Sequence, residues 1–198
     1  MRTYLSTVQK NRLWVAVLFG FILMGSSIGV CNFSFKLFFT EKFEFLFHLF
    51  PSLYNQESAI LIFKSALLET GVLMALSFLF GFSAIGQPFS CFLLLLHGFL
   101  FGVSVTQYTG DNMIRTVLNL TSAIPYAIIS SIILVIAVKE SVRFSNSFFK
   151  YSFKYDLSDD ICHKCRMYHV RYGILLFFLI ASALLYSFLI HTISIISH

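Results

Sequence analysis

The sequence predicts an all-α integral membrane protein with five transmembrane helices, organised as one transmembrane domain over residues 1–198. Hydrophobic residues make up 58% of the chain and charged residues only 12%, whereas soluble domains average about 25% charged residues. The apolar residues also occur in runs of about 17 or more, long enough to cross a hydrocarbon layer of about 30 Å. Both observations exclude an ordinary soluble enzyme.

Five apolar segments are long enough to be spans. They cover residues 13–30, 59–80, 87–105, 114–138 and 172–190. We interpret the first as a retained anchor and not as a cleaved signal peptide. A lipoprotein signal needs a small residue before its cysteine, and Val30 stands before Cys31; no A-x-A-like cleavage site is present either. An odd number of spans puts the two termini on opposite sides of the membrane.

The distribution of basic residues predicts the orientation. Ten of the fourteen Lys and Arg residues lie in the N-terminal tail or in residues 139–171. Short basic loops remain on the cytoplasmic side, so we expect an N-in/C-out, multi-pass protein of the bacterial cytoplasmic membrane. The net charge of +5 reflects mostly this bias, and it indicates anionic lipid as a partner and no nucleic acid.

Two polar segments predict amphipathic helices that lie in the membrane interface. The outer segment 32–58 and the inner segment 139–171 both mix Phe with charged residues, a composition that suits the headgroup region. The inner segment is the larger cytoplasmic surface, and we expect it to contact a cytoplasmic partner. The residues predicted for this partner surface are Glu140, Arg143, Phe148, Phe149 and Lys150.

The second and third spans should form an antiparallel hairpin. Only a short glycine-containing segment separates them, and Gly81, Gly86 and Pro88 suit a tight turn that leads into the next helix. The hairpin prediction depends on this short connection.

Two GxxxG pairs predict close helix packing. Gly25 and Gly29 lie in the first span, and Gly98 and Gly102 lie in the third. Small residues at this spacing allow helices to approach closely in lipid. The pairs either pack within one molecule or form a homodimer interface.

Two ionisable residues lie near the middle of their spans. Glu69 lies in the second span and His97 in the third. Placing an ionisable side chain at this depth costs free energy unless the side chain is paired or faces a polar cavity. Because the spans run in opposite directions, we expect Glu69 and His97 to meet. Such a pair would hold the helices together or form a proton-linked or substrate-linked site.

The sequence "CHKCRMYH" contains ligand types that zinc uses. Cys162, His163, Cys165 and His169 lie within eight residues. A single C-x-x-C without a second half at zinc-finger spacing is weak evidence. A metal site, thiol redox chemistry and juxtamembrane residues without special function all remain open.

Sequence motifs of enzymes are missing. The chain has no Walker A loop, no H-E-x-x-H and no G-x-S-x-G. We therefore expect no catalytic residues, no cofactor and no enzymatic activity, and favour a scaffold or a permease.

Two stretches carry a family resemblance. "GFSAIGQPFSCFLLLLHGFLFGVSV" and "LTSAIPYAIISSIILVIAVKESVRFS" resemble the core of the stage II sporulation protein M family of bacterial membrane proteins, over roughly residues 65–150. That family has a glycine-rich turn, a paired glycine motif and a proline-containing span that ends in a Glu and Arg element. The matching positions are Gly81, Gly86 with Pro88, Gly98 with Gly102, Pro125, and Glu140 with Arg143.

The resemblance implies a membrane scaffold that anchors or localises peptidoglycan hydrolases. It also allows the membrane subunit of an ATP-binding cassette exporter for a peptide or bacteriocin, bound to a cytoplasmic ATPase, or an associated immunity protein. His97 stands where the family has a small polar residue, and the family's pattern contains neither the Phe-rich outer segment nor the "CHKC" element. These departures leave scaffold and transport relatives both open.

Overall fold

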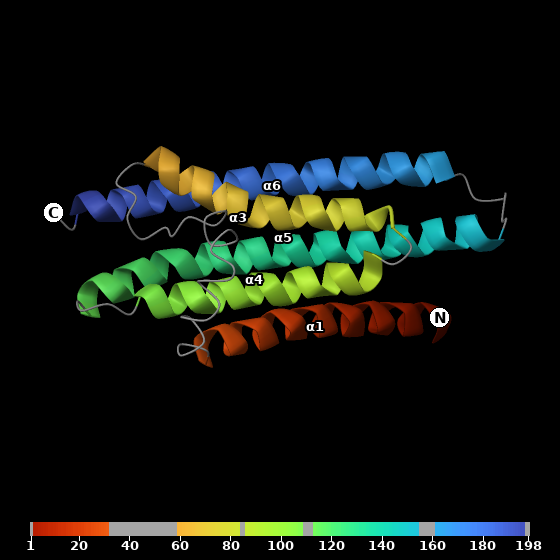
Figure 1. Cartoon of the computed structure of the whole chain (residues 1–198), viewed down its shortest axis with the longest axis horizontal. Helices are drawn as coiled ribbons and strands as arrows, with labels where there is room; N and C mark the ends of the chain where they lie inside the picture. The colour runs from red at the N-terminus through yellow and green to blue at the C-terminus, as the bar shows by residue number, and fades with distance from the viewer. Residues whose placement is uncertain (1, 32–58, 84–85, 109–112, 155–160, 197–198) are drawn as a thin grey trace, which may run out of the picture.

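The computed structural model describes residues 2–31, 59–83, 86–108, 113–154 and 161–196. This part of the chain forms five helices that lie side by side in one elongated bundle (Figure 1). The helices are α1 (Arg2–Cys31), α3 (Ala59–Gly81), α4 (Gly86–Tyr108), α5 (Met113–Lys154) and α6 (Ile161–Ile196). The predicted interfacial helix over 32–58 lies outside the described residues.

All five helices contain a stretch long and apolar enough to cross a membrane. The stretches are Leu13–Cys31, Ala59–Gly81, Gly86–Val105, Ala123–Tyr151 and Cys162–Thr192. Long apolar side chains such as Leu23, Leu79, Phe177 and Phe188 are exposed on the outside of the bundle, as expected of surfaces that face lipid. The described part of the chain is thus all-helical, and its five long apolar helices agree with the predicted all-α membrane protein.

The last two spans are longer than the sequence predicts. The fourth continues through 138 to Lys154 within α5, and the fifth begins with Ile161 in α6 and not near 172. The prediction of a separate interfacial helix over the inner segment is therefore wrong for residues 140–154. These residues continue α5 because Ser141, Phe144 and Ser145 are buried inside the bundle.

The helix hairpin lies where the short connection predicts it. The chain leaves α3 after Gly81 and enters α4 at Gly86, with the amide of Gly86 donating to the carbonyl of Ser83. A Cβ atom at Gly86 would overlap the carbonyl oxygen of Phe80. Only glycine fits so close to the preceding helix end.

The two GxxxG pairs bring α1 and α4 into contact within one molecule. A Cβ atom at Gly25 would overlap the carbonyl oxygen of Leu95, and one at Gly98 would overlap that of Ile22. A Cβ at Gly29 would lie 3.1 Å from the Cα of Gly102. The glycine pairs therefore pack on each other within one molecule. Of the two alternatives, the structure shows the intramolecular one.

The other helices meet through a hydrophobic core with polar residues embedded in it. α5 contacts all four other helices, and α3 also packs on α4 and α6. Leu94, Leu134, Val138 and Leu179 are fully buried where these helices meet. α1 lies at the edge of the bundle, mainly against α4 (Figure 1).

Candidate functional site

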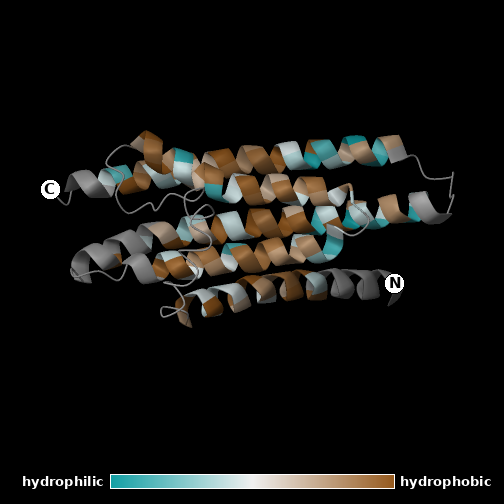
Figure 2. Cartoon of the chain, viewed as in Figure 1, coloured by the Kyte–Doolittle hydropathy of each residue, from teal (hydrophilic) through white to brown (hydrophobic). Residues whose placement is uncertain are grey.

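Polar residues gather at one end of the bundle. Here α3 turns into α4, α5 ends and α6 begins, and we call this the basic end (Figure 1). Figure 2 shows hydrophilic residues concentrated on α5 and α6 towards this end, whereas the middle of the bundle is mostly hydrophobic. The lysines and arginines of residues 139–154 and 161–171 belong to these two helix segments.

A cleft of about 320 Å³ opens between α5 and α6 at the basic end. It is lined by Glu140, Arg143, Phe144 and Ser147 of α5 and by His163, Lys164, Met167, Tyr168 and Arg171 of α6. On both helices the lining positions recur every three or four residues. This spacing places the lining residues of each helix on one face. The cleft therefore lies between one face of α5 and one face of α6.

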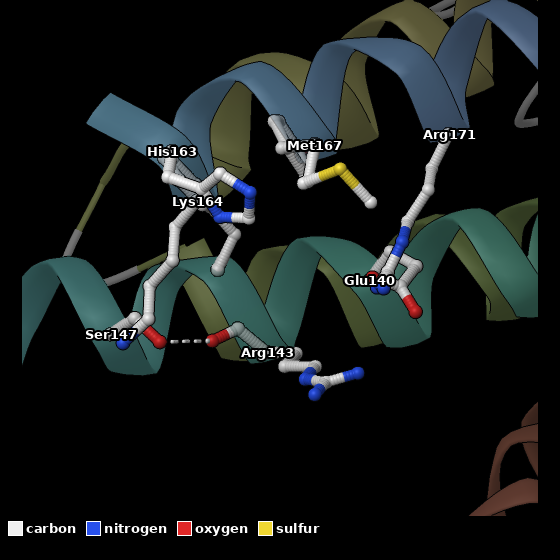
Figure 3. A pocket seen from close by; sticks show the side chains of 9 residues that line it. Glu140, Arg143, Ser147, His163, Lys164, Met167 and Arg171 are labelled. Carbon is white, nitrogen blue, oxygen red and sulfur yellow. Dashed lines mark hydrogen bonds and ion pairs between the residues drawn. The ribbon is translucent and has the colours of Figure 1, made fainter. Parts of the chain in front are cut away.

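An ion pair closes one end of the cleft. Arg171 of α6 donates to the carboxylate of Glu140 on α5, and the two side chains are 39% and 18% exposed. Figure 3 shows Arg171 extending across to Glu140, while Lys164 descends from α6 towards Ser147 on α5. The pairing neutralises the only carboxylate in the lining. The lining therefore contains more basic than acidic side chains, with Arg143, Lys164 and Arg171 against Glu140.

Aromatic rings form the inner wall of the cleft. The rings of Phe144 and Tyr168 stack with centroids 4.4 Å apart, and Tyr168 also stacks on Phe78 of α3. The Tyr168 hydroxyl donates to the carbonyl of Phe78 at 3.0 Å. This wall ties α6 to α3 and α5, and it gives the cleft an apolar surface beside its cationic one.

A second tyrosine holds the same three helices together deeper in the bundle. Tyr172 donates to the carbonyl of Ala137 at 2.8 Å, and its hydroxyl lies 3.0 Å from Oγ of Ser77. Ser141 donates to the carbonyl of Ser77 at 2.8 Å. In lipid such interhelical hydrogen bonds satisfy polar groups that have no water to bind.

The hairpin is also fastened to α5. Ser145 donates to the carbonyl of Ser83 at 2.6 Å, and the side-chain amide of Gln87 donates to Oδ1 of Asn146 at 2.7 Å. Because Ser83 and Gln87 flank the turn, these bonds fix the turn against the part of α5 that carries the cleft.

The predicted partner surface divides between the cleft and the outside of α5. Glu140 and Arg143 line the cleft, whereas Phe148, Phe149 and Lys150 do not. Phe149 and Lys150 are exposed, and Phe148 is half-buried. These five residues therefore do not form a single face.

The metal-site prediction is wrong for the structure described. No three His, Cys, Asp or Glu residues gather as a metal site within the described residues. Only Cys165 and His169 meet, with Sγ 3.7 Å from Nδ1, and that nitrogen also lies 2.8 Å from the Cys165 carbonyl oxygen. The segment is helical, so Cys162 is seven residues and about 10 Å along the axis from His169. His163 contributes to the cleft instead.

The predicted contact between Glu69 and His97 is not formed. His97 is 3% exposed and its Nε2 lies 3.1 Å from Oγ of Ser131 on α5, while its Nδ1 has no hydrogen-bonding partner in the described structure. Glu69 is half-buried on α3, and in the described structure no hydrogen bond or ion pair joins it to His97. Depth in the membrane does not determine the rotation of a helix, so two residues at similar depth on neighbouring helices need not meet.

His163 was predicted for a metal site and not for this cleft, and six other lining residues were not among the predicted site residues: Phe144, Ser147, Lys164, Met167, Tyr168 and Arg171. The spacing of Glu140, Arg143 and Ser147 matches that of Lys164, Met167 and Arg171, and this repeat was the available signal. Both sets of residues lie in the inner segment 139–171, whose mixture of Phe and charged residues predicts a helix in the membrane interface.

In the comparisons made, no protein family, curated protein or solved structure matches this chain. The site must therefore be interpreted from its own geometry. Its lining offers cationic donors, a hydroxyl and an apolar wall, a combination suited to binding an anion that carries an apolar part.

Proposed function

We propose that this chain is a non-enzymatic membrane scaffold, with the basic end in the cytoplasm, that anchors or localises partner proteins. The partner class follows from the sequence resemblance and is cell-wall (peptidoglycan) hydrolases on the outer side. The N-in/C-out orientation follows from the excess of Lys and Arg at the basic end.

The observation that carries this proposal is the close backbone contact of α1 and α4. Gly25, Gly29, Gly98 and Gly102 bring the two backbones together over two helical turns. Opening a path for cargo between these helices would break this contact along its whole length. A bundle fastened in this way suits a rigid anchor better than a moving permease.

The remaining interfaces support the same conclusion. The α3–α5–α6 contacts contain buried hydrogen bonds from Tyr126 and Tyr172 to backbone carbonyls. Each must break without replacement if these helices separate in lipid, because the hydrocarbon offers no alternative partner.

A permease subunit of an ATP-binding cassette exporter is the second candidate. The long ends of α5 and α6 at the basic end favour it, because they provide a rigid surface to which a cytoplasmic ATPase can dock. Phe149 and Lys150 are exposed on this part of α5.

Purification in mild detergent with identification of the bound proteins tests the two candidates. The scaffold predicts that wall hydrolases co-purify and that the double variant Phe149→Ala/Lys150→Gln retains them. The exporter predicts a cytoplasmic ATPase in stoichiometric amount that this variant loses. Stoichiometric ATPase without hydrolases would refute the scaffold.

A further inference from the structure

We propose that the α5–α6 cleft is a binding site for the phosphate headgroup of an anionic phospholipid, whose acyl chain continues along the exposed face of α6. The inference does not depend on the scaffold proposal, because it rests on the depth, charge and shape of the cleft alone.

The lengths of the two helices put the cleft at headgroup depth. The apolar stretches Ala123–Tyr151 and Cys162–Thr192 contain 29 and 31 residues, which correspond to about 44 and 46 Å of helix. The hydrocarbon layer is about 30 Å thick, and about 40–45 Å with its headgroups. The excess of about 15 Å is about ten residues on each helix. The Lys, Arg and Glu residues of both stretches all lie at the basic end, from Lys139 onwards in α5 and up to Arg171 in α6. We therefore place the excess there, at roughly residues 142–151 and 162–171, which include most of the cleft lining.

The charge of the lining favours an anion. Arg143, Lys164 and Arg171 are the Lys and Arg residues of the lining, and Glu140 is its only carboxylate and is already bound to Arg171. Within the described residues, the guanidinium of Arg143 takes part in no ion pair. Arginine and lysine are the side chains that bind phosphate most strongly, through charge-assisted hydrogen bonds. Basic pockets between transmembrane helices are suited to lipid headgroups for this reason.

The shape of the lining favours an amphiphile over a free ion. Met167 forms part of the cleft and is 40% exposed, so the cleft opens onto the lipid-facing surface of α6 there. Val170 and Ile174 follow at three and seven residues beyond Met167, on the same helix face, and both are about half exposed. An acyl chain attached to a phosphate in the cleft would lie along this apolar stripe towards the middle of the membrane.

The test uses the full chain in detergent and native mass spectrometry with added lipid. Phosphatidylglycerol supplies the anionic headgroup, and phosphatidylcholine of the same acyl chains is the neutral comparison. We expect at least one phosphatidylglycerol to be retained under conditions that strip phosphatidylcholine. Equal retention of both lipids would overturn the inference.

Paired variants test whether the cleft is the site. Arg143→Gln/Lys164→Gln removes one cation from each wall and should weaken phosphatidylglycerol binding by about tenfold. Lys139→Gln/Arg166→Gln removes the same charges from the same two helices outside the cleft, and it should change binding by less than about twofold. Equal losses in both double variants would show attraction to overall charge and no site.

A third variant distinguishes loss of binding from loss of structure. Met167→Glu leaves every cation in place and adds a carboxylate to the half-exposed rim, where it repels a phosphate. It should lower phosphatidylglycerol binding while the helix content and the unfolding transition stay unchanged. Binding at the original strength would contradict the inference.

Inorganic phosphate distinguishes a lipid headgroup from a free anion. If the acyl chain contributes, millimolar phosphate should leave bound phosphatidylglycerol in place. Complete displacement at that concentration would assign the cleft to free phosphate and overturn the lipid assignment.

Discussion

The contact between α1 and α4 gives the sharpest prediction, because a single methyl group tests it. In Gly98→Ala the new Cβ would lie 2.9 Å from the carbonyl carbon of Ile22 and 3.0 Å from its Cα. Ordinary carbon contacts require about 3.5–4.0 Å and the carbonyl oxygen of Ile22 lies closer still, so the two helices must separate by about 1 Å. No side-chain rotation relieves this contact, since the colliding atoms belong to the backbone.

The cost follows from the packing that is lost. A gap of this size removes about a quarter to a half of the dispersion energy of each atom pair, and roughly 20 pairs of about 0.15 kcal/mol give a loss of about 1 kcal/mol. Strain from overpacking brings the expected destabilisation to about 1–3 kcal/mol. Gly20→Ala in α1 should instead stabilise the protein. An added Cβ meets nothing within 4 Å there, and alanine is a better helix former than glycine by about 0.5–1 kcal/mol.

The free energy of unfolding, measured by titration with a denaturing detergent, compares the two variants directly. Gly98→Ala should unfold at lower denaturant and Gly20→Ala at the same or higher denaturant than the parent chain. Equal stability of the two variants would refute the reasoning, because it would mean that the α1 and α4 backbones are not in contact in the folded protein.

Two further predictions concern the interior hydrogen bonds and the cysteines. Tyr172→Phe removes the donor to the Ala137 carbonyl and should lower the free energy of unfolding by about 0.6–1.7 kcal/mol. Tyr151→Phe, at an exposed position, should change it by less than about 0.5 kcal/mol. Similar losses in both variants would show that the interhelical bond does not stabilise the protein. After incubation with zinc and removal of unbound metal, elemental analysis should find no stoichiometric zinc, because the helix keeps the predicted ligands apart. Cys162→Ser should not alter that result. Zinc that the parent chain retains and this variant loses would contradict the structure.

The number of spans and the hairpin could be predicted because both depend on local sequence. A run of apolar residues long enough to cross the hydrocarbon layer has few alternatives to a helix in lipid. Gly86 lies so close to the end of α3 that the turn admits no larger residue. The glycine pairs are also local patterns, although the sequence left open whether Gly25 and Gly98 meet within one chain or between two.

The ends of α5 and α6 could not be predicted because their polar residues are satisfied by each other. A hydropathy criterion stops the fourth span near Lys139 and starts the fifth near Tyr172. In the folded bundle Glu140 pairs with Arg171, and Ser141 binds the carbonyl of Ser77. A local criterion does not detect partners this far apart in sequence, so residues that belong to the bundle were predicted to lie in the membrane interface.

The error at His97 has a related cause. Its depth in the third span indicated a polar partner, and the partner exists, but it is Ser131 and not Glu69. An ionisable residue inside a span predicts only that a polar group is near. Which helix supplies that group depends on helix rotation, which a period of 3.6 residues fixes only once the neighbouring helices are known.

The bundle is held by two different kinds of contact, and the difference bears on how it works. α1 is attached to α4 by close backbone approach, whereas α3, α5 and α6 are joined by hydrogen bonds from tyrosine and serine. Backbone contact weakens gradually as helices separate, but a buried hydrogen bond is lost at once and leaves two unsatisfied groups in lipid. Both kinds of contact hold the helices together, and the buried hydrogen bonds within the α3–α5–α6 group resist even small separations. The cleft lies inside that fixed group, so it presents a constant surface at the basic end.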